Sequence, residues 1–244
     1  MPNRGSRRIM HILMAGGVLL SVAALAFMAG RKTAAPDPAP LACRPSAPVL
    51  AAKASGAERL ILMLGNSQLH DHDWVFPGSF VVNCARQGLP AHVARPLLPG
   101  LPDLKPDTII VAFGAVELQR AGLKSQPLDQ AGFAETLHGV VSDLQARWPD
   151  AGIVLAGIPP MRPGRFPPGR EPDSEMRLTM NRDLAAIARA SGKVRFSDPD
   201  DRLPVDAGGL TEAMTHDGLH LTPAAYALWQ EQLWAVAMAL DEGR

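Results

Sequence analysis

RLILMLG, residues 59–65, is apolar from its second residue to its sixth, without alternation between polar and apolar side chains. Continuous apolar runs of this length are typical of strands that are buried on both faces of a parallel sheet. Four similar runs follow along the chain: SFVVNCA at 79–85, DTIIVAFG at 107–114, GIVLAGIP at 152–159 and VRFSDP at 194–199. We therefore predict a parallel sheet of five strands.

The segments between these runs have the spacing of amphipathic helices, which parallel strands need as crossover connections. The best marked helix starts at Pro223, with Thr222 as its N-cap. Strand and helix alternate through the rest of the chain, which predicts a three-layer α/β/α sandwich with its site at the carboxyl ends of the strands. We expect helices at about 69–75, 90–98, 128–148, 173–191 and 223–240.

A long apolar segment precedes these elements. IMHILMAGGVLLSVAALAFMAG, residues 9–30, contains no Lys, Arg, Asp or Glu, and three arginines stand before it. A helix of this length spans the ~30 Å hydrocarbon core of a bilayer, and basic residues before it place the rest of the chain outside the cytoplasm. We expect residues 1–32 to be a signal anchor in the inner membrane, with cleavage near Ala24–Ala26 as the alternative.

The remainder divides into a tether and a domain. Residues 33–57 are rich in Ala and Pro, which favours an extended tether, and residues 58–244 form the predicted domain. We expect this domain to be periplasmic and anchored to the membrane, or soluble or secreted after signal cleavage. Cys43 and Cys84 are the two cysteines of the chain. An oxidising compartment permits a disulfide between them, and two separate thiols are the alternative.

Composition excludes several classes of protein. The chain is 47% hydrophobic and 20% charged, which excludes a disordered chain. Its 24 basic residues balance 24 acidic ones, but five basic residues lie within the first 32 positions, so the domain is mildly acidic. Nucleic acid is not an expected partner, because phosphate binding needs clustered Lys and Arg.

Three residues in two separate segments indicate nucleophilic catalysis. Ser67 follows the first predicted strand, and Asp217 and His220 precede the last helix. This spacing lets the carboxylate hold one imidazole nitrogen while the other nitrogen faces the serine, which predicts a Ser-His-Asp triad. Taken singly, each residue has another interpretation: Ser67 as a helix N-cap, Asp217 as a turn residue and His220 as a core histidine.

Over residues 60–240 the chain resembles the SGNH hydrolase family, also called GDSL-type esterases and lipases. The resemblance implies a flavodoxin-like α/β/α fold and hydrolysis of esters or thioesters, with acyl transfer in some branches. It depends on the order and spacing of four blocks: GNS at 65–67, NCARQG at 83–88, GAVE at 114–117 and DGLH at 217–220.

The resemblance also implies roles for single residues. Ser67 would be the nucleophile, His220 the base and Asp217 its orienter, while the backbone amides of Ser67 and Gly88 would donate to the oxyanion. It implies neither a cofactor nor a metal, and the expected partner is a small-molecule or glycan ester. We predict an extracytoplasmic serine esterase. The alternatives are an acyltransferase that modifies an envelope polysaccharide and a non-catalytic binding or scaffold protein of the same fold.

Two positions depart from the family pattern. Asn66 stands where the first block usually has Asp, which keeps the size of the side chain and loses its charge. Val116 stands where the third block has Asn, and a valine side chain has no hydrogen-bond donor. Removing one oxyanion donor typically lowers the rate by about 10²–10³-fold. Gln119 and Gln68 are the candidates to replace the missing donor.

Two further clusters contain residues that can form binding sites. The run HDHD at 70–73 contains good metal ligands, but too few of them share a face for a closed site, so a polar first helical turn is the preferred interpretation. The proline-rich segment 161–172 follows the fourth run and predicts a loop at the same sheet edge. Its arginines would face either an anionic substrate or solvent; they are Arg162, Arg165 and Arg170.

Overall fold

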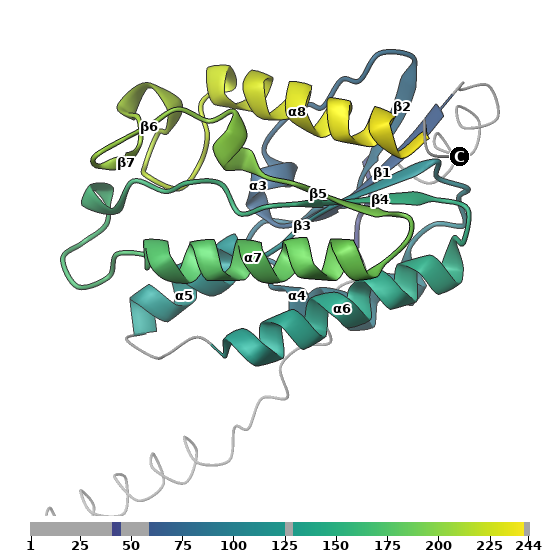
Figure 1. Ribbon diagram of the computed structural model, residues 1–244, viewed down its shortest axis with the longest axis horizontal. Helices are drawn as coiled ribbons and strands as arrows, with labels where there is room; N and C mark the ends of the chain where they lie inside the picture. Colours follow the sequence, from purple (N-terminus) through teal and green to yellow (C-terminus); the bar gives the residue numbers. More distant parts are fainter. Residues whose placement is uncertain (1–40, 45–58, 125–128, 242–244) are drawn as a thin grey trace, which may run out of the picture. The chain divides into compact units, whose positions relative to one another are not determined.

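The computed structural model describes residues 41–44, 59–124 and 129–241, all of which belong to one structural unit (Figure 1). Five parallel strands form its sheet in the order β2-β1-β3-β4-β5. This order is that of flavodoxin-like folds and confirms the predicted five-stranded parallel sheet. The strands are β1 (Arg59–Gly65), β2 (Ser79–Asn83), β3 (Thr108–Ala112), β4 (Gly152–Ala156) and β5 (Val194–Ser197).

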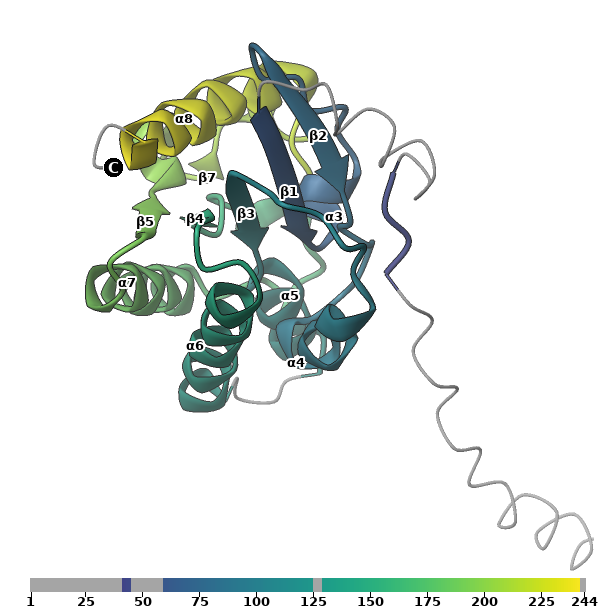
Figure 2. The same cartoon turned by 90° about the vertical axis from the view of Figure 1, so that its right-hand side faces the viewer.

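Helices lie on both faces of the sheet (Figure 2). The α-helices are α3 (Ser67–His70), α4 (Ala91–Ala94), α5 (Ala115–Lys124), α6 (Gln130–Arg147), α7 (Ser174–Ala190) and α8 (Pro223–Asp241). Short 3₁₀ segments are η1 (Arg95–Gly100), η2 (Pro163–Arg165), η3 (Pro199–Asp201) and η4 (Glu212–Met214), and a small antiparallel ribbon pairs β6 (Val205–Asp206) with β7 (Gly209–Leu210). Helices α4 to α7 cover one face and α8 covers the other, so the predicted three-layer sandwich is confirmed.

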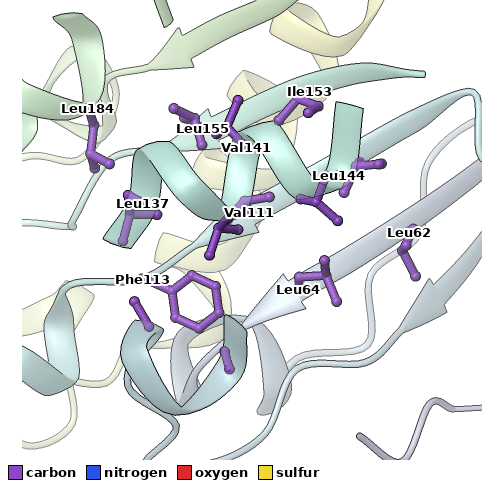
Figure 3. Packing of buried hydrophobic residues seen from close by; sticks show 14 of the residues in the cluster. Leu62, Leu64, Val111, Phe113, Leu137, Val141, Leu144, Ile153, Leu155 and Leu184 are labelled. Atoms are coloured by element: carbon purple, nitrogen blue, oxygen red, sulfur yellow. The ribbon is translucent and has the colours of Figure 1, made fainter. Parts of the chain in front are cut away.

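The continuous apolar run of β1 is explained by its two buried faces. Leu62 and Leu64 belong to the same core cluster as Leu144 of α6, and Figure 3 labels all three. Ile61 and Met63 belong to the second core, beneath α8. Successive side chains of a strand point to opposite faces, so both sets must be apolar when helices cover both faces.

The three long helices agree with the sequence prediction, whereas two shorter ones do not. The helix expected at about 69–75 is wrong, because α3 ends at His70. The Leu69 carbonyl accepts hydrogen bonds from the Trp74 ring N–H (2.8 Å) and the Asn83 side chain (2.9 Å), which replace a further helical turn. Helix α5 was not predicted, because it is short, at ten residues, and most of its residues are polar or small.

The strand order reverses between β1 and β3, and ligands of such folds bind at the carboxyl ends of the strands on either side of this point. The chain leaves β1 toward Ser67, leaves β3 toward residues 114–117, and leaves β2 toward residues 84–88. Three of the four sequence blocks therefore meet at one edge of the sheet.

The predicted anchor 1–32, with its apolar segment 9–30, lies outside the described residues, as does most of the predicted tether 33–57. Among the residues that the structure describes, no helix is long and apolar enough to span a bilayer. Residues 41–44 of the tether are described. They include Cys43, which forms a disulfide with Cys84, so the paired alternative for the two cysteines is confirmed.

Candidate active site

Ser67 is placed by a tight turn between β1 and α3. The Asn66 side chain caps α3 by accepting from the Gln68 amide (3.0 Å), so Asn66 takes the capping role that was the alternative for the serine. A Cβ on Gly65 would lie 2.5 Å from the Ala112 carbonyl oxygen of β3, so a larger residue would push the turn away from the sheet. Ser67 is 9% exposed at the first position of the helix.

Asp217 and His220 come from the loop that precedes α8. The Asp217 Oδ1 atom accepts from the backbone amides of Leu219 (2.9 Å) and His220 (2.7 Å), which fixes the carboxylate against its own turn. Its Oδ2 atom lies 2.7 Å from His220 Nδ1, and His220 Nε2 lies 3.2 Å from Ser67 Oγ. The structure thus brings together the three residues that the sequence indicated.

The chemistry of the partners decides which nitrogen of His220 carries the proton. An ionised carboxylate only accepts, so Nδ1–H donates to Asp217 and Nε2 is left to accept the Ser67 hydroxyl proton. Burial raises the pKa of the Asp217 carboxyl, but the hydrogen bonds from His220 and Leu219 and the nearby imidazole outweigh it, and the net pKa is lowered. The carboxylate is therefore charged at neutral pH and stabilises a protonated imidazole.

The turn that carries His220 depends on Gly218. Its φ is +92°, and a Cβ there would lie 2.7 Å from the Arg162 carbonyl oxygen. The Thr215 hydroxyl accepts from the Gly218 amide and donates to the His220 carbonyl, both at 2.9 Å. The Arg162 amide donates to the Gly218 carbonyl at 2.8 Å. The proline-rich segment 161–172 is thus packed directly against the histidine turn.

Gly88, the second expected donor, lies in the loop after β2. The Cys84 and Arg86 amides donate to the carbonyls of Met63 (2.9 Å) and Gly65 (3.0 Å), so the loop starts alongside the end of β1. Gly88 has a φ of +64°, in the left-handed region that favours glycine. The loop therefore brings a glycine amide to the same edge of the sheet as Ser67.

The third block contains a residue that sequence analysis left without a role. The Glu117 carboxylate accepts from the amides of Ala91 (2.7 Å) and Gly114 (3.0 Å), which joins α4 to the end of β3. Burial raises its pKa despite these hydrogen bonds. The sequence signal that could have indicated this role is the position of Glu117, an acidic residue in the first helical turn after a buried strand. The neighbouring Val116 side chain is buried, with 5% of its surface exposed.

The two glutamines proposed to replace the missing donor differ in position. The Gln68 side-chain amide donates to the Leu219 carbonyl at 2.8 Å and is buried. This bond commits one of the two Gln68 side-chain N–H groups to the histidine turn. Gln119 is half-buried on α5.

The run HDHD at 70–73 is divided among different partners. The His70 and Asp71 side chains are hydrogen-bonded to each other (2.6 Å), whereas the His72 ring stacks on Tyr226 with a centroid separation of 4.5 Å. Burial lowers the pKa of His72. Within the described ranges, no group of three His, Cys, Asp or Glu side chains is arranged to hold a metal ion.

Two arginines of the segment 161–172 have acidic partners. Arg162 contacts both carboxylate oxygens of Asp206 (3.0 and 3.1 Å) and donates to the Leu210 carbonyl, and Arg165 pairs with Glu212 at 3.3 Å. These bonds hold the β6-β7 ribbon and η4 beside the segment. Both arginines therefore have a structural function in the loop.

Comparison with known proteins identifies the family of the chain. Residues 66–228 match the model of the GDSL-like Lipase/Acylhydrolase family. No curated protein matches the chain.

Several solved structures are similar to the chain. A GDSL-like lipase from Bacteroides thetaiotaomicron is 15% identical with a TM-score of 0.60, over 81% of this chain and 98% of that one. A mutant acetyl-xylooligosaccharide esterase from Geobacillus is 16% identical with a TM-score of 0.56, over 75% and 95%. A carbohydrate esterase family 2 enzyme from Myceliophthora fergusii is 17% identical with a TM-score of 0.57, over 76% and 67%. At these identities the likeness shows the fold.

Proposed function

The chain belongs to the GDSL-like lipase/acylhydrolase family, and we propose that it is a serine esterase that acts through an acyl-serine intermediate. The observation that carries the proposal is the continuous series of contacts from Asp217 through His220 to Ser67. Each atom in this series is positioned for transfer of the serine proton to the imidazole.

The proposed reaction has two steps. The Ser67 oxygen attacks the acyl carbon while its proton passes to His220 Nε2, and Asp217 stabilises the imidazolium. The amides of Ser67 and Gly88 donate to the oxyanion. Collapse of this intermediate breaks the bond to the alcohol, which takes the proton from His220. Water then attacks the acyl-serine with His220 again as base, releases the acid and restores Ser67.

The proposed location is outside the cytoplasm. The apolar segment 9–30 after three arginines motivates an inner-membrane anchor, and the Cys43–Cys84 disulfide fits an oxidising compartment such as the periplasm. Two of the similar structures are carbohydrate esterases, so acetylated saccharides are natural substrates to test beside simple esters.

The test is hydrolysis of p-nitrophenyl acetate, butyrate and octanoate, together with labelling by a fluorophosphonate probe. We expect hydrolysis and labelling by the wild-type protein, and loss of both in Ser67→Ala and His220→Ala. Matched controls are Ser142→Ala and His138→Ala, which remove exposed residues of the same types on α6. Hydrolysis that persists in Ser67→Ala would overturn the assigned nucleophile.

A non-catalytic binding protein is the second candidate, and Val116 is the observation that favours it. Without the third-block donor, the site can hold a ligand and turn it over poorly. Absence of fluorophosphonate labelling in correctly folded protein would support this candidate. Labelling without hydrolysis would instead support acyl transfer to an alcohol such as a sugar hydroxyl.

A further inference from the structure

Residues 41–44 lie outside the matched family region 66–228 and yet join the domain next to its site. Leu41 is 7% exposed and belongs to the main core. Arg44 pairs with Asn83 at the end of β2 through two backbone hydrogen bonds of 2.8 and 3.1 Å. The Cys43–Cys84 disulfide adds a covalent link at the same point.

This link attaches at the start of the loop that carries Gly88. Cys84 is the first residue after β2, and Gly88 follows four positions later. Asn83 also contacts both neighbours of the site, because its side chain donates to the Leu69 carbonyl of α3 (2.9 Å) and accepts from the Ala85 amide (3.0 Å). The segment 41–44 therefore holds the residue at which β2, α3 and the loop meet.

A second series of contacts reaches the other end of the loop. The Arg44 guanidinium contacts His70 Nε2 and donates to the His70 carbonyl oxygen at 3.4 Å. Arginine only donates, so Nε2 is the acceptor and His70 Nδ1–H donates to Asp71 Oδ1 at 2.6 Å. The same Asp71 oxygen accepts from the Gln87 side chain at 2.9 Å, and Gln87 directly precedes Gly88.

We propose that Arg44 and the Cys43–Cys84 disulfide are positioning groups of the active site, which fix the loop 84–88 at both ends and so hold the Gly88 amide in place for the oxyanion. This inference rests on the proposed esterase function. The disulfide acts at Cys84, and Arg44 acts through His70 and Asp71 on Gln87. With Val116 supplying no donor, the Gly88 amide contributes a larger share of oxyanion stabilisation than it would in a site with three donors.

The first test compares the oxidised full-length protein with the same protein reduced by dithiothreitol, which converts the disulfide to two thiols. We expect kcat for p-nitrophenyl acetate to fall about 10-fold or more on reduction, with little change in KM, because the lost interaction forms only in the transition state. Amide exchange should rise in residues 84–88 and stay unchanged in β3 and α6. The Cys43→Ser/Cys84→Ser double variant should have the kcat and the amide exchange of the reduced protein, and dithiothreitol should change neither.

The second test keeps the disulfide and removes the other contact. Arg44→Ala should lower kcat and raise amide exchange at residues 86–88, and Arg44→Lys should restore part of the loss, because a lysine also donates to His70. The matched control is Arg182→Ala, at an exposed position on α7.

The outcomes separate this inference from the proposed function. If the oxidised protein has neither hydrolysis nor fluorophosphonate labelling, the proposed function fails, while amide exchange at residues 84–88 still tests the positioning. Unchanged kcat and unchanged exchange in the reduced protein would overturn the inference. Exchange that rises throughout the sheet on reduction would also overturn it, since the disulfide would then stabilise the fold rather than the loop.

Discussion

The two halves of the candidate site are built in different ways. On one side, Ser67, His220 and Asp217 form a polar series of contacts of 3.2 and 2.7 Å that is partly open to solvent. On the other side, the third block presents the buried Val116, and the buried Glu117 carboxylate binds two backbone amides.

This difference separates two requirements of ester hydrolysis. Proton transfer needs a few side chains at correct distances, and those are present. Stabilisation of the oxyanion needs hydrogen-bond donors directed at the developing negative charge. In the third block, Val116 packs among buried residues and Glu117 binds two backbone amides, so neither side chain is such a donor. Variants can therefore test each half of the site on its own.

The largest expected effect is on the proton-transfer side. Asp217→Asn should lower kcat by about 10⁴-fold, because an amide no longer holds His220 in the tautomer that accepts from Ser67. Steady-state hydrolysis of p-nitrophenyl acetate measures this loss. Asp150→Asn, at an exposed position, is the control. A variant that retains most of its activity would mean that Asp217 orients only its own turn.

On the oxyanion side, a substitution at Val116 is expected to increase kcat. Val116→Asn should raise kcat by up to about 10²–10³-fold by adding a donor. It should also lower the free energy of unfolding by about 1–3 kcal/mol, since a polar amide replaces a buried apolar group. The control is Val116→Ala, which loses packing without gaining a donor. If the two variants have equal kcat, another group already supplies that donor or the site is not hydrolytic.

Glu117 supports the oxyanion side without being expected to touch substrate. Glu117→Gln should lower the free energy of unfolding by about 1–3 kcal/mol, because the new amide group faces one of the two backbone N–H groups that the carboxylate accepts. Urea denaturation measures this change, with the exposed Glu135→Gln as control. Equal destabilisation by both variants would contradict the role given to the buried carboxylate.

The two carboxyl groups should also respond to pH in opposite directions. The pKa of Glu117 is raised by burial, so its contribution to stability falls as pH rises above the unfolded value of 4.5 toward the folded pKa. The pKa of Asp217 is lowered, so its contribution is complete above the unfolded value of 3.8 and is lost as pH falls through the folded pKa. Urea denaturation of the wild type, Glu117→Gln and Asp217→Asn at a series of acidic pH values measures how the free energy of unfolding depends on each carboxyl group. Both effects should be small. Parallel curves would contradict the assignment.

Local patterns in the sequence were sufficient for the framework and for the pairing of Asp217 with His220, whereas the contact of His220 with Ser67, 153 residues away, was expected from the order of the four blocks. The apolar runs of the strands reflect burial on two faces, which local sequence records directly. Asp217 and His220 lie within one turn of chain, so their contact is also local. Spatial relations across the sheet were not predictable in this way: the attachment of Glu117 to Ala91 joins separate loops. The early end of α3 depends on Asn83, which lies in the next strand.

The packing of Gly218 against the Arg162 carbonyl bears on how such a hydrolase can be redesigned. The segment 161–172 follows β4 and is a natural place to exchange loops between relatives when a new substrate range is wanted. Here the exchanged segment would press on the turn that carries His220. A graft must therefore keep the backbone at residue 162 in its present position against Gly218, and libraries that vary the loop will be limited to backbones that leave this contact unchanged.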